Sequence, residues 1–178
     1  MADPNLEGYI DREQNRFYGL YLGSVAETYS GKRGELVVSV PQVFGPDLVR
    51  NARPATPFAG SAQGFFAMPE KGTRVWVAFE AGDPSFPVWI GCLWGDHDLT
   101  GADNDPKVKF FKTAKFTLRI DDSLGEVEIS NANGCKITLG SVGIQIEGAS
   151  LKFKTKGGRE VSLDAPGVDI NQGGATFL

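Results

Sequence analysis

The sequence has few of the residues from which metal and catalytic sites are usually built. It contains one histidine, His97, and two cysteines, Cys92 and Cys135, among 178 residues. Zinc sites draw three or four ligands from such residues, so we expect no metal and no cofactor in a single chain. We interpret the cysteines as buried free thiols in separate strands, although the sequence leaves a disulfide between them open.

Long hydrophobic runs and strong positive charge are also missing. No apolar stretch approaches the roughly 18 residues that a membrane span needs. The segment 1–9 has acidic residues and no apolar block, unlike a secretory signal, so we expect synthesis in the cytoplasm. A net charge of −4 argues against a nucleic-acid partner, because domains that bind nucleic acids are usually basic.

Helix-forming runs are scarce, whereas glycine and proline punctuate many short strand-like segments. This texture predicts an all-β protein. Only residues 11–21 could form a short helix. Changes in composition and strand pattern divide the chain into four segments. They are an N-terminal arm or short helix over 1–18, a compact barrel over 19–100, a linker over 101–106 and a repetitive region over 107–178.

Residues 19–100 contain strands of the kind found in a small closed barrel. Val75, Val77 and Phe79 alternate with other residues and predict one buried face. About five strands in about 80 residues fit an OB-type barrel. The predicted strands are 20–26, 35–40, 74–79 and 87–93, and residues 43–58 are interpreted as a long loop. The tryptophans Trp76, Trp89 and Trp94 suit either the barrel core or an interface.

The region 107–178 repeats short alternating strands at intervals of roughly 7 to 10 residues. The predicted strands are 116–120, 126–129, 135–139, 144–147, 151–154, 161–163 and 168–170. Their alternation predicts one inward face, which carries Val127, Ile129, Ile137, Leu139, Ile144, Ile146, Leu151 and Phe153. Two inward residues per strand bury too little apolar surface for one chain, so we favour intertwining of identical chains. A one-chain β-solenoid and an antiparallel meander packed on the barrel are the alternatives.

Several ordered motifs resemble a known family. Val37 to Gly45 (VVSVPQVFG) is similar to the opening of the OB domain in phage baseplate assembly protein V, in T4-type tail-spike lysozymes and in VgrG spikes of type VI secretion. Pro69 to Pro84 is similar to the family stretch P-x-x-G-x-x-V-x-V-x-F-x-x-G-D, and Pro87-Val88 followed by Gly91 continues it. The repeats over 107–178 look like the trimeric β-helix of the same family.

This resemblance implies a structural protein and not an enzyme. It implies a homotrimeric central spike of a contractile phage tail or related injection system, an OB barrel followed by an intertwined trimeric β-helix. The spike would attach to a baseplate hub, enter a virion tail or injection particle, and pierce the target envelope with transient membrane contact. No segment corresponds to the relatives' lysozyme domain, and no histidine follows His97 to bind a metal at the tip. Phe177 and Leu178 would then form a platform for a separate tip protein of the PAAR type, or fold back and plug the axis.

One cluster could compete with this interpretation. Asp96-His97-Asp98 has the residue types of a catalytic or metal site, but adjacent loop residues rarely converge, and we interpret the cluster as a solvated link. An OB-fold module that binds carbohydrate or oligonucleotide is the alternative function. The balanced charges of residues 19–100 disfavour an oligonucleotide.

Overall fold

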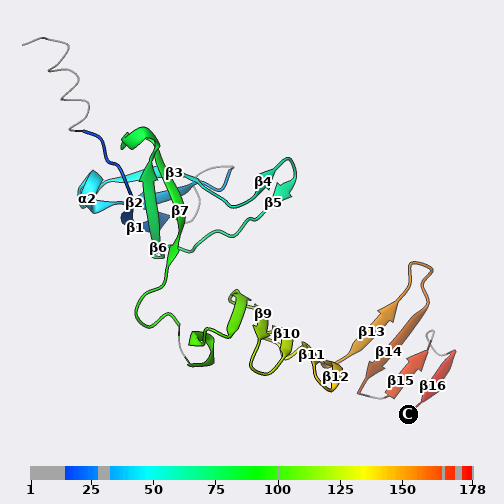
Figure 1. The fold of residues 1–178 in the computed structure, drawn as a ribbon. Coiled ribbons are helices and arrows are strands. Elements are labelled where there is room, and N and C mark those ends of the chain that lie inside the picture. Colours follow the sequence, from blue (N-terminus) through cyan, green and yellow to red (C-terminus); the bar gives the residue numbers. More distant parts are fainter. Residues whose placement is uncertain (1–14, 28–32, 100, 166, 171–173, 178) are drawn as a thin grey trace, which may run out of the picture. The chain divides into compact units, whose positions relative to one another are not determined.

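The computed structural model describes residues 15–27, 33–99, 101–165, 167–170 and 174–177 (Figure 1). The chain divides into two compact units, residues 1–98 and 99–178. Strands make up nearly all of the regular structure in both units, and the first unit contains a closed barrel. The predicted all-β class and the N-terminal barrel are therefore confirmed.

The barrel is closed by five strands. They are β1 (Tyr21–Glu27), β2 (Leu36–Ser39), β3 (Val49–Pro54), β6 (Arg74–Phe79) and β7 (Pro87–Leu93), and their order around the barrel is β1-β2-β3-β7-β6. All neighbours are antiparallel except β3 and β7, which pair in parallel. Closure leaves none of these five strands with a free edge.

The barrel core consists of branched aliphatic and aromatic side chains, with one alanine, and every barrel strand contributes to it. Val75, Val77 and Phe79 are all buried, which confirms the face predicted for β6. The other buried core residues are Val25, Leu36, Val38, Val40, Ala52 and Trp89. The Trp89 Nε1–H donates a hydrogen bond of 3.0 Å to the Gly34 carbonyl, so this tryptophan is held in the core at both its apolar and its polar end.

The interpretation of residues 43–58 as a loop is wrong. After a short helix, α2 (Pro41–Phe44), residues 49–54 form β3, the barrel strand between β2 and β7. Only Ala52 of β3 is fully buried. The strand therefore lacks the apolar alternation by which the other barrel strands could be recognised. Between β3 and β6 the chain makes a small hairpin, β4 (Ala59–Gly60) and β5 (Gln63–Gly64).

The end of the N-terminal arm is fixed to the turn between β6 and β7. This turn contains the 3-10 segment η1 (Glu80–Gly82). The Phe17 amide donates to the Gly82 carbonyl at 2.8 Å, and Arg16 forms an ion pair with Asp83 at 3.5 Å. Residues 15–20 are not helical; residues 11–14 of the predicted helix lie outside the described residues.

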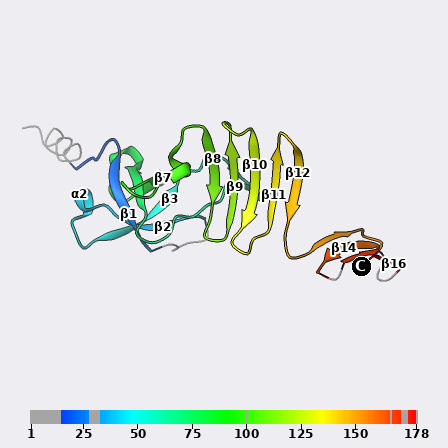
Figure 2. The same ribbon diagram turned by 90° about the horizontal axis from the view of Figure 1, so that it is seen from below.

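The second unit contains two antiparallel meanders. A 3-10 segment, η2 (Gly101–Asn104), precedes the first sheet. That sheet consists of β8 (Val108–Lys112), β9 (Phe116–Asp121), β10 (Glu126–Asn131), β11 (Lys136–Gly140) and β12 (Gly143–Glu147), side by side in chain order (Figure 2). The other sheet consists of β13 (Leu151–Lys154), β14 (Glu160–Asp164), β15 (Gly167–Ile170) and β16 (Ala175–Phe177). Because sequential strands pair antiparallel, a one-chain β-solenoid is wrong.

Leu36→Ala tests the barrel core. Leu36 is fully buried, so truncation should leave a cavity and lower the free energy of unfolding by about 2–5 kcal/mol. Leu48→Ala is the control, because Leu48 is 50% exposed and its truncation should change stability by less than about 0.5 kcal/mol. Urea unfolding followed by tryptophan fluorescence measures both, since all three tryptophans lie in the barrel unit. Equal effects would contradict the assigned core.

Candidate assembly surface

One face of the β8–β12 sheet is apolar and open to solvent. The strand register places Val127 opposite Ile120 and Leu139, and Ile137 opposite Ile129 and Ile146. Residues paired in this way project from the same side of a sheet. The face comprises Phe111, Phe116, Leu118, Ile120, Val127, Ile129, Ile137, Leu139, Ile144 and Ile146, and every one except Val127 is exposed. We call this set the apolar sheet face.

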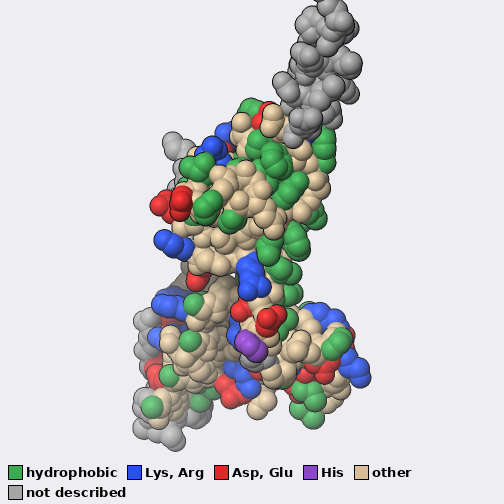
Figure 3. Space-filling view, turned by 90° about the vertical axis from the view of Figure 1, so that its left-hand side faces the viewer, with side chains coloured by type: hydrophobic (Ala, Val, Ile, Leu, Met, Phe, Trp, Pro, Cys, Tyr) green, Lys and Arg blue, Asp and Glu red, His purple; other side chains and the backbone are tan. Residues whose placement is uncertain are grey.

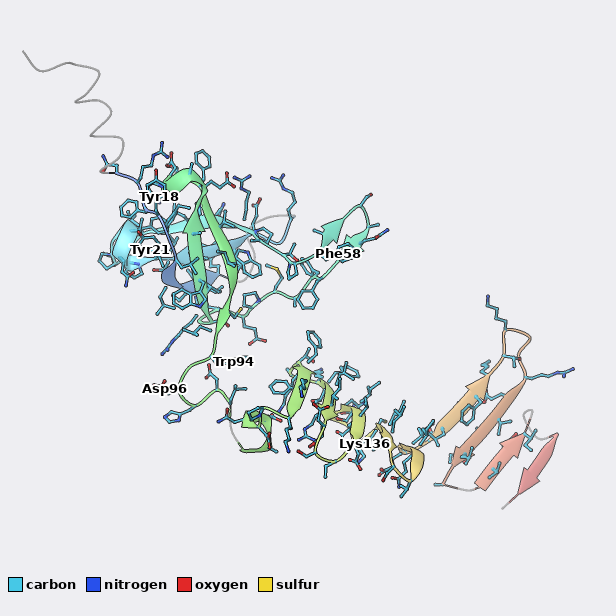
Figure 4. The ribbon with its side chains drawn as sticks, in the orientation of Figure 1. Tyr18, Tyr21, Phe58, Trp94, Asp96 and Lys136 are labelled. Carbon is cyan, nitrogen blue, oxygen red and sulfur yellow. The ribbon has the colours of Figure 1, made fainter. Side chains whose placement is uncertain are left out.

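The side chains of the opposite, polar face are less exposed to solvent than those of the apolar sheet face. Lys136, labelled in Figure 4, lies between Glu128 at 3.9 Å and Glu147 at 3.6 Å. The Arg119 side chain is only 23% exposed, whereas Ile144 is 72% exposed. Folded proteins normally show the reverse order, with apolar groups inside and charges outside. This inversion indicates that something else covers the apolar sheet face when the protein is assembled.

Asp121 closes the turn between β9 and β10 from the polar side. Its Oδ1 accepts hydrogen bonds from the Ser123 and Leu124 amides at 2.9 and 3.1 Å, and Arg119 forms an ion pair with it at 3.0 Å. Burial alone would raise the pKa of Asp121, but the Leu124 and Ser123 amides and the Arg119 guanidinium outweigh it and hold the pKa below its ordinary value. Asp121 therefore serves as a structural carboxylate of the turn.

The β13–β16 sheet repeats the same division between its faces. Its register aligns Leu151 with Leu163 and Phe153 with Val161, and Val168 and Ile170 continue this side on β15. Phe153 is 57% exposed. On the other side Lys152 and Lys154 both pair with Glu160, at 3.6 and 3.5 Å. Each sheet of the second unit thus has one apolar side with large exposed residues.

The eight inward positions predicted from the sequence fall on these two apolar sides. Six of them, on β10–β12, belong to the apolar sheet face, and Leu151 and Phe153 belong to the second sheet. Whether they form a shared core stays a prediction. Sequence reasoning missed Phe111, Phe116, Leu118 and Ile120 as members of the same face, although the alternation of residues 116–120 carried the signal.

The cysteines, the tryptophans and the C-terminal pair were also singled out from the sequence. The expectation of buried cysteines is wrong: Cys92 and Cys135 are free thiols and exposed in the single chain. Trp89 belongs to the core, Trp76 is half-buried and Trp94 is 64% exposed. Phe177 belongs to β16, a strand that was not predicted, and Leu178 lies outside the described residues.

The Asp96-His97-Asp98 cluster lies in an exposed connection. Asp98 accepts a hydrogen bond from the Gly95 amide, and His97 is exposed at the surface seen in Figure 3. Among the residues that the structure describes, no group of three or more histidine, cysteine and acidic residues could hold a metal ion. Within the same ranges, no helix is long and apolar enough to cross a membrane.

Comparison with known proteins yields two successive matches to family models. Residues 21–94 match the type VI secretion system/phage-baseplate injector OB domain. Residues 107–176 match the phage baseplate V C-terminal trimerisation domain. The comparison with curated proteins gives no match. The second matched range contains the whole of the apolar sheet face, so the family model attributes trimerisation to the region whose apolar side is uncovered in one chain.

Ile146→Asp tests the apolar sheet face. Three carboxylates per trimer would be moved into an apolar contact without partners, at a cost of several kcal/mol each, and we expect loss of the trimer. Gln145→Asp on the same strand is the control, because its side chain lies on the polar face opposite Thr138. Sedimentation velocity measures both variants. A stable Ile146→Asp trimer would show that this face is not the contact.

Proposed function

The chain belongs to the phage-baseplate V family of injector proteins, and on that basis we propose that it forms the piercing central spike of a contractile tail or tail-like injection system. The family places it in a baseplate and makes it a homotrimer. The proposal adds three finer statements: the second unit is an intertwined trimeric β-helix, the barrel end attaches to a hub, and the C-terminal end leads into the target envelope. We propose a mechanical and not an enzymatic role.

The observation that carries this proposal is the uncovered apolar sheet face. Fully burying a valine, leucine, isoleucine or phenylalanine side chain stabilises a fold by about 1.5–3 kcal/mol. The half-exposed residues of this face therefore represent on the order of 10 kcal/mol per protomer before ordering costs. The β8–β12 meander is a single sheet, and it has no second layer of its own to bury them against. Three copies can supply that layer to each other.

Intertwining also suits a shaft that transmits force. In the proposed helix the apolar sides of the three chains meet at the axis, and the ion-paired polar sides, with Lys136 between Glu128 and Glu147, face solvent. Pulling one chain out would expose its entire apolar side at once. Such a shaft resists bending and fraying better than separate sheets, which is the property that a puncturing device needs.

We propose that the barrel end, including the arm, binds the hub. Tyr18 and Phe86 are 62% and 52% exposed, and the anchored arm lies against the β6–β7 turn that precedes Phe86. Figure 3 shows hydrophobic side chains gathered over the barrel, and Figure 4 labels Tyr18 beside it. Exposed aromatic residues next to a polar arm are typical of a contact surface for another protein.

Deletion of residues 1–14 tests hub attachment. It spares Arg16 and Phe17, whose contacts with Asp83 and Gly82 fix the start of the barrel. We expect an unchanged trimer whose incorporation into assembled particles falls at least tenfold, scored by quantitative immunoblotting of purified particles. Tyr18→Ala provides a second variant within the described residues. Normal incorporation of both would contradict attachment through this end.

At the C-terminal end we propose a separate tip protein of the PAAR type, seated on Phe177 and Leu178. The strand β16 pairs with β15 and, among the described residues, with no further strand. It is thus an edge strand that another chain could cover. The tip protein would shield backbone groups that are costly to drive into lipid.

The double change Phe177→Ser with deletion of Leu178 tests the tip. It leaves the β15–β16 pairing at Asp169 and Ile170 in place, so the trimer should keep its melting temperature while co-purification of a tip protein is lost. A marked fall in melting temperature, with no partner bound to the unaltered chain, would favour self-plugging of the axis instead.

A further inference from the structure

A preformed apolar groove lies on the barrel beside the β4–β5 hairpin. It has a volume of about 410 Å³, and we call it the barrel groove; Pro54, Phe58, Phe65, Met68, Trp89 and Ile90 are among its lining residues. The Phe65 amide donates to the Phe58 carbonyl at 2.9 Å, and the Thr56 hydroxyl donates to the Phe65 carbonyl at 3.1 Å. These bonds close the loop across its base, so the groove exists before anything binds.

Large apolar side chains of the barrel groove and its rim are exposed to solvent in the single chain. Phe58 and Phe65 are each 55% exposed, Phe66 is 74% exposed and Ile90 is 44% exposed. Arg33 is the charged residue among the described lining, and its side chain is 83% exposed. A groove of this size and composition suits a large apolar group, because pockets of about 300–1,000 Å³ with mostly apolar walls are those that hold ligands.

Trp94 is an exposed aromatic residue at the place where the chain leaves the barrel. It is 64% exposed and is not among the groove-lining residues of its own chain. It follows β7, whose residues Ile90 and Cys92 line the groove. Figure 4 labels Phe58 and Trp94 at separate places on the barrel unit. Apolar exposure therefore runs from the groove along β7 to the exit of the chain.

The trimer brings other copies of both features within reach. Only residues 95–106 separate Trp94 from the region matched to the trimerisation domain, which begins at 107. Fully extended, such a linker spans about 45 Å at most. Each barrel is thus confined near two others, at the millimolar effective concentrations typical of short tethers. Among possible occupants of the groove, a second copy of this chain is the one that trimerisation holds close to it.

We propose that Trp94 of each protomer inserts into the barrel groove of the next protomer, so that three barrels form a closed ring. A threefold contact is heterologous, which requires two different complementary patches on each copy and closes when the rotation is one third of a turn. The barrel supplies both patches, a groove and a projecting tryptophan. Tryptophan is also the residue type most enriched among interface anchors. The inference goes beyond the proposed function and needs only the trimer.

Photo-crosslinking of the purified full-length trimer tests this contact. With benzoylphenylalanine in place of Trp94, irradiation should give two-chain and three-chain bands, with crosslinked peptides within 54–68 or 89–92. The same probe at Leu48, which is 50% exposed, should give at least tenfold less interchain product. An intact trimer without interchain product, or with crosslinked peptides elsewhere, would overturn the inference.

Trp94→Ala supplies a second measurement that does not depend on the probe. The trimer should persist, because the region 107–176 still holds it together. Hydrogen exchange of backbone amides in residues 55–68 should become several-fold faster in the variant, since the groove loses its occupant. Unchanged exchange in an intact trimer would contradict the inference alone. A chain that is not trimeric would overturn this inference and the proposed function together.

Discussion

The exposure of one apolar sheet face is the constraint on which the rest of this molecule depends. A sheet is stable when its apolar side is buried against another layer. In the β8–β12 meander the charged side is the covered one, through Arg119, Asp121 and Lys136 with their partners, while Ile144 is 72% exposed. Within the second unit this constraint is not satisfied, and the match to a trimerisation domain favours further copies of the chain as the missing layer.

The barrel satisfies the same requirement within one chain. Its five strands close on themselves, and its core, from Val25 to Trp89, is buried without help from a partner. The two units therefore differ in how far each buries its own apolar residues. On the proposed account the barrel can fold alone, whereas the sheets of the second unit become stable through assembly, so that their folding would depend on protomer concentration. This division suits a part that must be built into a larger particle.

Much of this organisation could be read from the sequence, because alternation directly encodes which side of a strand is apolar. The strands over 116–170 and the shared apolar side of β10–β12 follow from it. The strand β3 could not be found, since Ala52 is its only fully buried residue. The strand β8 was missed because Lys109 shares a side with Phe111 and interrupts the alternation. The exposure of Cys92 could not be predicted, because Cys92 lies in an apolar strand and pairs with the fully buried Val75. The barrel groove is lined by segments that lie far apart in the chain, so no local sequence pattern predicts it.

The mass of the full chain in solution tests the central claim most directly. Sedimentation equilibrium at micromolar concentration should give the mass of three chains, about 57 kDa from 19.1 kDa per chain. On dilution, monomers should appear only as the second unit unfolds. A monomer that retains the β-structure of residues 107–176 at micromolar concentration would contradict the account, because the apolar sheet face would then be stable without a partner to cover it.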